Sequence, residues 1–271
     1  MYRRFIAALF AFIVVSVPAQ QMQPLPTAAC EVLLPYGRPL HATLESIPIC
    51  RHAYALEYSL HHKTPVWVAH LLRPEYTVGC LERDDTFEAD LSVPLKHRVY
   101  PTDFRSSGYD MGHMVSSADM SWDALVMRET FIMTNIAPQL PGFNRGIWRR
   151  LEDQTRAWAQ ERKHPLLVYT GPIYSGEHTV AIERDKIILI PDEYFKVIVD
   201  TETREVLAFR IPHKPSSGPL SAFLTDTAQI GAVTGLKFPL PQGYIGSSRM
   251  WPSKLKSTRL AKSIICATGG F

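Results

Sequence analysis

The sequence has little net charge and few cysteines for its length, and both shortages exclude classes of protein. Its 271 residues hold 29 lysines and arginines against 26 aspartates and glutamates, which gives a formal charge of +3. The chain as a whole is therefore not strongly basic, and any surface that binds a polyanion must be a local patch. The four cysteines form no C-x-x-C pair, which argues against a structural zinc site.

Long apolar runs are also lacking. The run 5–17 is shorter than the roughly 20 residues that a membrane-spanning helix needs. It follows two arginines and ends at small residues, a pattern typical of a secretory signal peptide. We therefore predict that residues 1–19 are a signal peptide, that the protein is secreted or periplasmic, and that it keeps no stable membrane association after cleavage. The alternative is an uncleaved anchor or a buried helix.

The cysteines fit an exported protein, because disulfides form in oxidising compartments. Four cysteines allow three pairings. We predict Cys30–Cys50 and Cys80–Cys266, with buried free thiols as the alternative.

The composition, with 46% hydrophobic residues, is ample for a globular core. Residues 20–53 are rich in proline and lack periodicity, so we expect an N-terminal strap. Strands on both sides of a central helical block predict a single α+β domain over 54–248. Residues 249–271 form a basic C-terminal tail around Trp251 that either contacts nucleic acid or is simply solvated.

The hydrophobic pattern predicts the elements of that domain. Residues 54–59 and 65–72 should pair as a hairpin at one side of a sheet, and 79–108 should be loop. Further strands are expected at 166–170, 186–190, 194–199 and 205–211, and helices at 121–133, 144–163 and 220–236.

The clearest helix begins at Asn144 and carries Glu152 two turns later. On an unbroken helix these residues lie about 80° apart around the axis and about 12 Å apart along it. A bond to magnesium is only about 2.1 Å long, so both cannot be direct ligands unless the helix starts late. We assign the metal to Asn144 and a metal-bound water to Glu152. The alternatives are a helix N-cap for Asn144 and an i,i+4 salt bridge between Glu152 and Arg156.

His113 lies 31 residues before Asn144. A neutral imidazole can take a proton from water near neutral pH, so His113 is our candidate general base. Arg73, Arg105 and Arg156 are candidates for neutralising the charge of a phosphoryl group. Taken singly, His113 is more often a surface or structural residue.

Three motifs together resemble one family: Asp110-x-Gly112-His113, Asn135-Ile-Ala-Pro-Gln139 and Asn144-x-x-x-Trp148-x-x-Leu151-Glu152. They are similar to the sugar-non-specific DNA/RNA endonucleases, the ββα-metal or His-Me finger group, and the likeness extends over about 54–238. It implies a central antiparallel sheet with the metal-site helix packed on it. It also implies His113 as general base, Asn144 as magnesium ligand and Glu152 in the water shell. Within this likeness we predict substrate-binding roles for Asn135, Gln139, Arg145 and Arg156, and motif support from Asp110, Gly112 and Trp148.

One position departs from the family pattern. Met111 stands where the family usually has arginine, which removes a phosphate-binding cation. Either Arg105 or Arg145 substitutes for it, or the enzyme is slower, or catalysis is lost. We favour substitution, because His113, Asn144 and Glu152 are all present.

The resemblance implies an exported endonuclease that depends on Mg2+, with Mn2+ as a second option. It should cut DNA and RNA with little sequence preference and leave 5′-phosphate and 3′-hydroxyl ends, and a homodimer is compatible with it. The rival hypotheses are a catalytically weakened nucleic-acid-binding protein of the same fold and a plain secreted structural domain.

Overall fold

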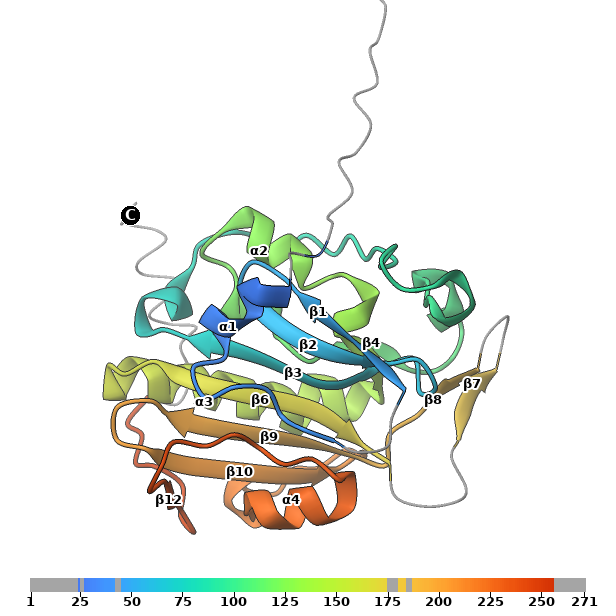
Figure 1. Ribbon diagram of the computed structural model, residues 1–271. Helices are drawn as coiled ribbons and strands as arrows, with labels where there is room; N and C mark the ends of the chain where they lie inside the picture. Colours follow the sequence, from blue (N-terminus) through green and yellow to red (C-terminus); the bar gives the residue numbers. More distant parts are fainter. Residues whose placement is uncertain (1–23, 25–26, 42–44, 175–179, 184–186, 256–271) are drawn as a thin grey trace, which may run out of the picture.

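The computed structural model describes residues 24, 27–41, 45–174, 180–183 and 187–255. Its centre is an eight-stranded sheet in the order β1-β2-β3-β6-β9-β10-β11, with β12 beside β10 (Figure 1). Every neighbouring pair is antiparallel except β10 and β12. The strands are β1 (Ser46–Cys50), β2 (Tyr54–Ser59), β3 (Pro65–Leu72), β6 (Leu166–Ile173), β9 (Glu193–Asp200), β10 (Glu205–Pro212), β11 (Leu224–Thr225) and β12 (Ile245–Gly246).

The central strands are almost continuously apolar because helices cover both faces of the sheet. Successive side chains point to opposite faces, so Val68 joins one core and its neighbours Trp67 and Ala69 join the other. The first core lies under α3 (Arg149–Arg162), and the second lies under α1 (Cys30–Leu33) and α4 (Thr227–Thr234). In Figure 1, α3 lies behind the sheet and α1 and α4 lie in front. The predicted α+β class with a central antiparallel sheet is confirmed.

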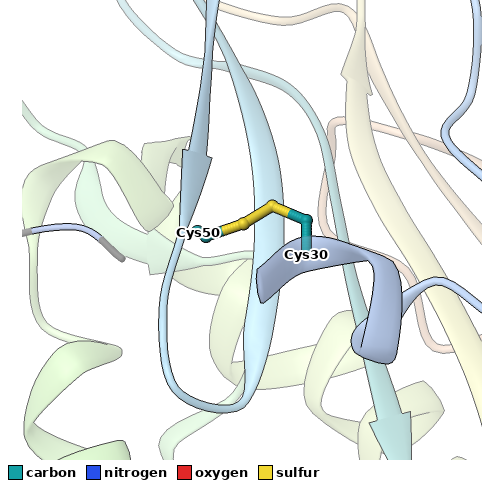
Figure 2. The surroundings of a disulfide bond; sticks show 2 residues. All are labelled: Cys30 and Cys50. Atoms are coloured by element: carbon teal, nitrogen blue, oxygen red, sulfur yellow. A yellow bond between two sulfur atoms is a disulfide. The ribbon is translucent and has the colours of Figure 1, made fainter. Parts of the chain in front are cut away.

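The Cys30–Cys50 disulfide is confirmed. It joins the start of α1 to the end of β1 with 5.5 Å between the two Cα atoms (Figure 2). It therefore fastens part of the predicted strap to the sheet. The second predicted pair involves Cys266, which lies outside the described residues, as does the predicted signal peptide.

The hairpin predicted at 54–59 and 65–72 is confirmed as β2 and β3. The strap, by contrast, contains an unpredicted strand, since β1 pairs with β2 along the edge of the sheet. Pro48 hides this strand from pattern reading, because proline is tolerated in a strand only where a ladder hydrogen bond is not needed, as at an edge.

Two predicted helices are too long. The helix expected over 121–133 is only α2 (Ala124–Glu129), whose N-terminus is capped by the Asp123 carboxylate. The helix expected over 220–236 divides into a 3-10 turn, strand β11 and the short α4, which begins after the Asp226 cap and ends at Gly235 with φ 72°. Capping residues inside an apolar stretch set these limits.

Two small hairpins lie outside the central sheet. The strand expected at 186–190 is β8 (Ile187–Leu189), which pairs with β7 (Ala181–Glu183). The other hairpin consists of β4 (Asp110–His113) and β5 (Ile136–Gln139). Among the described residues, no helix is long and apolar enough to cross a membrane.

Candidate active site

The β4–β5 hairpin and α3 form a ββα unit. Asp110 pairs with Gln139 and His113 with Ile136, so the first two motifs lie side by side. The chain then passes through a π-helical turn, Phe143–Trp148, before α3 begins. Gly146 breaks the regular helix there with φ −103° and ψ −108°. The prediction of one unbroken helix from Asn144 was therefore wrong, because glycine allows a backbone bend that regular helix does not.

This late start changes the relation between Asn144 and Glu152. The separation expected on an unbroken helix does not apply, and both residues line one cavity of 450 Å³. The cavity also brings together Asp110 and Arg145, two further residues predicted from the motifs. Its other lining residues are Arg83, Phe87, Met111 and Arg149.

The Asp110 carboxylate orients the Asn144 amide. Asn144 Nδ2 donates to Asp110 Oδ2 at 2.9 Å. Arg145 donates to the same carboxylate from Nε at 2.9 Å and from Nη2 at 2.6 Å. An ionised carboxylate only accepts, so the amide must turn its nitrogen toward Asp110. Its Oδ1 oxygen is left as the donor for a metal ion.

Glu152 supplies a second oxygen donor. Burial raises its pKa to about 7, while the charges of Lys196 and Arg156 act in the opposite direction and those of Asp119 and Asp153 reinforce the rise. The group therefore gains its negative charge around neutral pH. A bound cation would favour that charged form further.

This donor set fits a hard divalent cation. In the part of the chain that the structure describes, no group of three or more His, Cys, Asp or Glu side chains could hold a metal. An amide oxygen and a carboxylate beside an open cavity suit Mg2+, which prefers oxygen ligands and keeps several waters. They do not suit zinc in a closed structural site.

His113 lies next to this cavity but is not among its lining residues. Only 8% of the residue is exposed, and its ring packs against Phe87 at 5.5 Å and Phe131 at 4.9 Å between ring centroids. Burial, aided by the positive charge of Arg83, lowers the pKa of His113 to about 3. Nε2 is buried without a hydrogen-bond partner among the described residues. The imidazole is thus neutral and shielded from solvent. Phe87 connects it to the cavity, because Phe87 both contacts the His113 ring and lines the cavity.

The second motif fixes the backbone around His113. Asn135 Oδ1 accepts from the Val115 amide at 2.9 Å, and Asn135 Nδ2 donates to the carbonyls of Val115 and Thr130 at 3.0 and 2.9 Å. Asn135 is completely buried, so the structure places it as support for the chain after His113. Gln139 is also completely buried, which does not fit the predicted contact of either residue with substrate.

Three more predicted residues lie away from the cavity. Arg156 is buried, and its guanidinium binds Asp119 at 2.5 Å and Asp153 at 2.6 Å. These ion pairs take the place of the substrate contact predicted for Arg156, and also of the salt bridge to Glu152 that was its alternative. Arg73 and Arg105 are exposed beside 3-10 turns and are not among the residues that line the cavity.

The two tryptophans considered for nucleic acid or motif roles belong to the core. Trp148 is completely buried, and Lys196 Nζ lies 4.8 Å from the centre of its ring. Trp251 packs against Trp158, whose Nε1 donates to the Trp251 carbonyl at 3.0 Å. Stacking on a base is therefore not available to Trp251.

Sequence reasoning missed Arg83, Phe87 and Arg149. Arg149 precedes Glu152 by three residues on α3, and this spacing places both on one side of the helix. That signal was available. Arg83 and Phe87 come from the segment predicted as loop, and nothing in its pattern indicates where it folds.

The model of the DNA/RNA non-specific endonuclease family matches residues 40–241. The mitochondrial endonuclease G of Homo sapiens is 31% identical over 220 residues, which cover 76% of this chain and 72% of the relative. A nuclease of Nostoc sp. is 33% identical over 250 residues, 86% of this chain and 90% of the relative. The solved structure of the EndoG/EndoGI complex matches with a TM-score of 0.69 and 26% identity, over 78% of this chain and 91% of that one. The chain therefore belongs to the DNA/RNA non-specific endonuclease family.

Proposed function

We propose that this nuclease hydrolyses phosphodiester bonds of both DNA and RNA with little sequence preference, and that it requires Mg2+ or Mn2+. The observation that carries the proposal is the hydrogen bond from Asn144 Nδ2 to Asp110, which leaves the amide oxygen available for a metal ion, at a cavity that Asn144 and Glu152 both line. A bound divalent ion would stabilise the leaving 3′-oxygen there. The products expected from the family likeness carry 5′-phosphate and 3′-hydroxyl ends.

Three arginines at the cavity suit a phosphate group. The cavity is lined by three exposed arginines, Arg83, Arg145 and Arg149. A guanidinium group can bind two oxygens of one phosphate at once. Arg145 replaces the cation that Met111 removes, because Asp110 holds it in place with two hydrogen bonds. All three can contact the phosphate backbone of a nucleic acid, and such contacts carry no sequence information.

His113 accepts the proton of the attacking water in this proposal. Its neutral state is the form a general base needs. Burial makes it a weak base, so the substrate-bound state requires Phe87 to move and the imidazole to regain solvent. The pKa of His113 then rises toward its ordinary value of about 6.5, where proton transfer is efficient.

The signal-like pattern of residues 1–19 supports export, so we propose a secreted or periplasmic nuclease. The Cys30–Cys50 disulfide agrees with this, because an oxidising compartment preserves such bonds.

Incubation of the purified protein with plasmid DNA and with RNA tests the activity. Both should be degraded with Mg2+ and left intact with EDTA, and His113→Ala and Asn144→Ala should each lower the rate by at least about 100-fold. His61→Ala is the matched control, because His61 is an exposed histidine that does not line the cavity. Undiminished cutting by His113→Ala would refute its role as the base.

The second candidate function, a weakened nucleic-acid-binding protein, is favoured by Met111 alone. It predicts salt-dependent retention of DNA without cleavage under every divalent ion. The same gel assay distinguishes the two candidate functions when it also measures retardation of DNA at low salt.

A further inference from the structure

The turn before α3 determines where Asn144 lies. The Leu140 carbonyl accepts hydrogen bonds from the backbone amides of Phe143 at 3.0 Å and Asn144 at 2.9 Å. The position of Asn144 therefore depends on the orientation of the Leu140–Pro141 peptide group, which carries this carbonyl.

A histidine far away in sequence holds the other peptide group of the same residue, Gln139–Leu140, which shares the Leu140 Cα. The Leu140 amide donates to His213 Nε2 at 2.7 Å, and His213 Nδ1 lies 2.8 Å from the Pro191 carbonyl oxygen. A carbonyl only accepts and a backbone amide only donates, so the two partners dictate the tautomer. The proton is on Nδ1, and Nε2 is the unprotonated acceptor.

The surroundings keep the imidazole in this place. Its ring centroid is 5.2 Å from those of Phe143 and Tyr194 and 6.0 Å from that of Tyr109. Pro215, two residues further on, packs against the same turn, since a Cβ added to Gly142 would lie 2.8 Å from Pro215 Cγ. Residues 213–215 thus hold the turn both by a hydrogen bond and by packing.

We propose that His213 is a positioning residue for the metal-binding amide, because its Nε2 fixes Leu140 and the Leu140 carbonyl fixes Asn144. The inference rests on the proposed function only in taking Asn144 as the metal ligand. His213 itself touches neither the metal site nor the substrate, and it acts through the backbone of the turn. Groups that orient a metal ligand commonly change metal affinity about 10–100-fold when they are removed.

The arrangement also makes the turn sensitive to acid. Protonated Nε2 becomes a donor and faces another donor, the Leu140 amide, so the bond is lost. Burial is the largest effect on the pKa of His213 and lowers it, while the bond to Pro191 and the charge of Asp192 raise it. The facing titratable groups are Tyr109 and Tyr194, and burial keeps the pKa of Tyr194 well above its usual value, so it stays uncharged. The hydrogen bond from the Leu140 amide to His213 is therefore fully formed above the ordinary histidine pKa. It is lost as the pH falls through the lowered pKa of His213.

Two substitutions separate hydrogen bonding from packing. His213→Phe keeps a ring in the aromatic surroundings but has no acceptor, whereas the amide oxygen of His213→Gln can still accept from Leu140. Mn2+ binding measured by electron paramagnetic resonance without nucleic acid should weaken about 10-fold or more in His213→Phe and by less than about threefold in His213→Gln. The matched control is His97, whose Nδ1 contacts the Leu60 carbonyl at 2.7 Å away from the ββα unit. His97→Phe and His97→Gln should bind Mn2+ like the wild type.

Nitrogen NMR of the wild-type imidazole provides a test that needs no variant and no activity. It should show His213 with the proton on Nδ1 and a bare Nε2 at neutral pH. A proton on Nε2, or equal Mn2+ affinity in His213→Phe and the wild type, overturns the inference. A wild type that binds Mn2+ but cuts neither DNA nor RNA sinks the proposed function, while weaker Mn2+ binding by His213→Phe would still support the role of His213.

Discussion

Asp110 combines two tasks in a single carboxylate. It orients Asn144 and holds Arg145 by two hydrogen bonds, so its own charge is compensated by the cation it positions. A carboxylate left uncompensated at the cavity would repel a phosphate group. The exposed arginine and the amide proposed to bind the metal therefore depend on the same residue.

Gly112 is fixed by the approach of a side chain. A Cβ added there would lie 2.3 Å from Gln139 atoms, and both residues are buried. Gly112→Ala should therefore lower the free energy of unfolding by about 1–3 kcal/mol, measured by urea denaturation. Combining it with Gln139→Ala should recover part of the loss, because the clash is removed.

Gly246→Ala is the control for this prediction, since a Cβ at Gly246 meets no atom within 4 Å. It should change the free energy of unfolding by less than about 0.5 kcal/mol, as exposed surface substitutions generally do. Equal stability of Gly112→Ala and the wild type would contradict the assigned contact.

Among the elements, the segment 81–88 carries Phe87, which packs against the ring of His113. Its ends are tied down, because the Leu81 amide donates to the Ser121 carbonyl at 3.1 Å and the Glu88 amide to the Phe131 carbonyl at 3.1 Å. Between these two hydrogen bonds, residues 82–86 are exposed, while Phe87 is half-buried against the imidazole of His113. This loop therefore supplies one of the two aromatic rings that cover His113, while the other, Phe131, follows α2.

Phe87→Ala should expose His113 and raise its pKa from about 3 toward its ordinary value. Because the base must be neutral, the acid limb of kcat/KM, which reports the pKa of the free enzyme, should move to higher pH in the variant. Rates measured between pH 4 and pH 8, in steps of about one pH unit, check this, because the range includes the ordinary histidine pKa of about 6.5. Phe223→Ala, at a partly buried aromatic elsewhere on the core, should leave the profile unchanged. An unmoved acid limb in Phe87→Ala would show that Phe87 does not shield the base.

Elements and site were predictable to different extents, for physical reasons. The local sequence predicts the hairpin β2–β3 and the strands β6, β9 and β10, because each is a run of β-branched and aromatic residues. The late start of α3 depends on one glycine, and the cover over His113 depends on where a loop without periodicity packs. Asn144 and Glu152 were found as a pair because they share a motif. Only tertiary folding, by contrast, brings Arg83 to the cavity and His213 to the turn before α3.

At the scale of the whole molecule, the sheet separates the disulfide from the chemistry. Cys30 and Cys50 belong to the core under α1 and α4, whereas α3 and the cavity lie on the opposite face. The bond closes a loop with a sequence separation of 20, which in the chain-entropy account stabilises the fold by about 3 kcal/mol. Its contribution should therefore be to stability and not to the reaction.

The double variant Cys30→Ala/Cys50→Ala tests this separation. Urea denaturation should show a loss of about 3 kcal/mol in the free energy of unfolding, while the Mg2+-dependent cleavage rate at 25 °C should stay within about twofold of wild type. The connection that could transmit a change is Arg51, which follows Cys50 and binds the buried Asp90 at 2.6 Å, where Thr134 also donates at 2.7 Å. Because these bonds hold Arg51 independently of the disulfide, the β4–β5 hairpin should keep its place. A large fall in rate at full folding would instead mean that α1 and β1 help to set the geometry of the cavity.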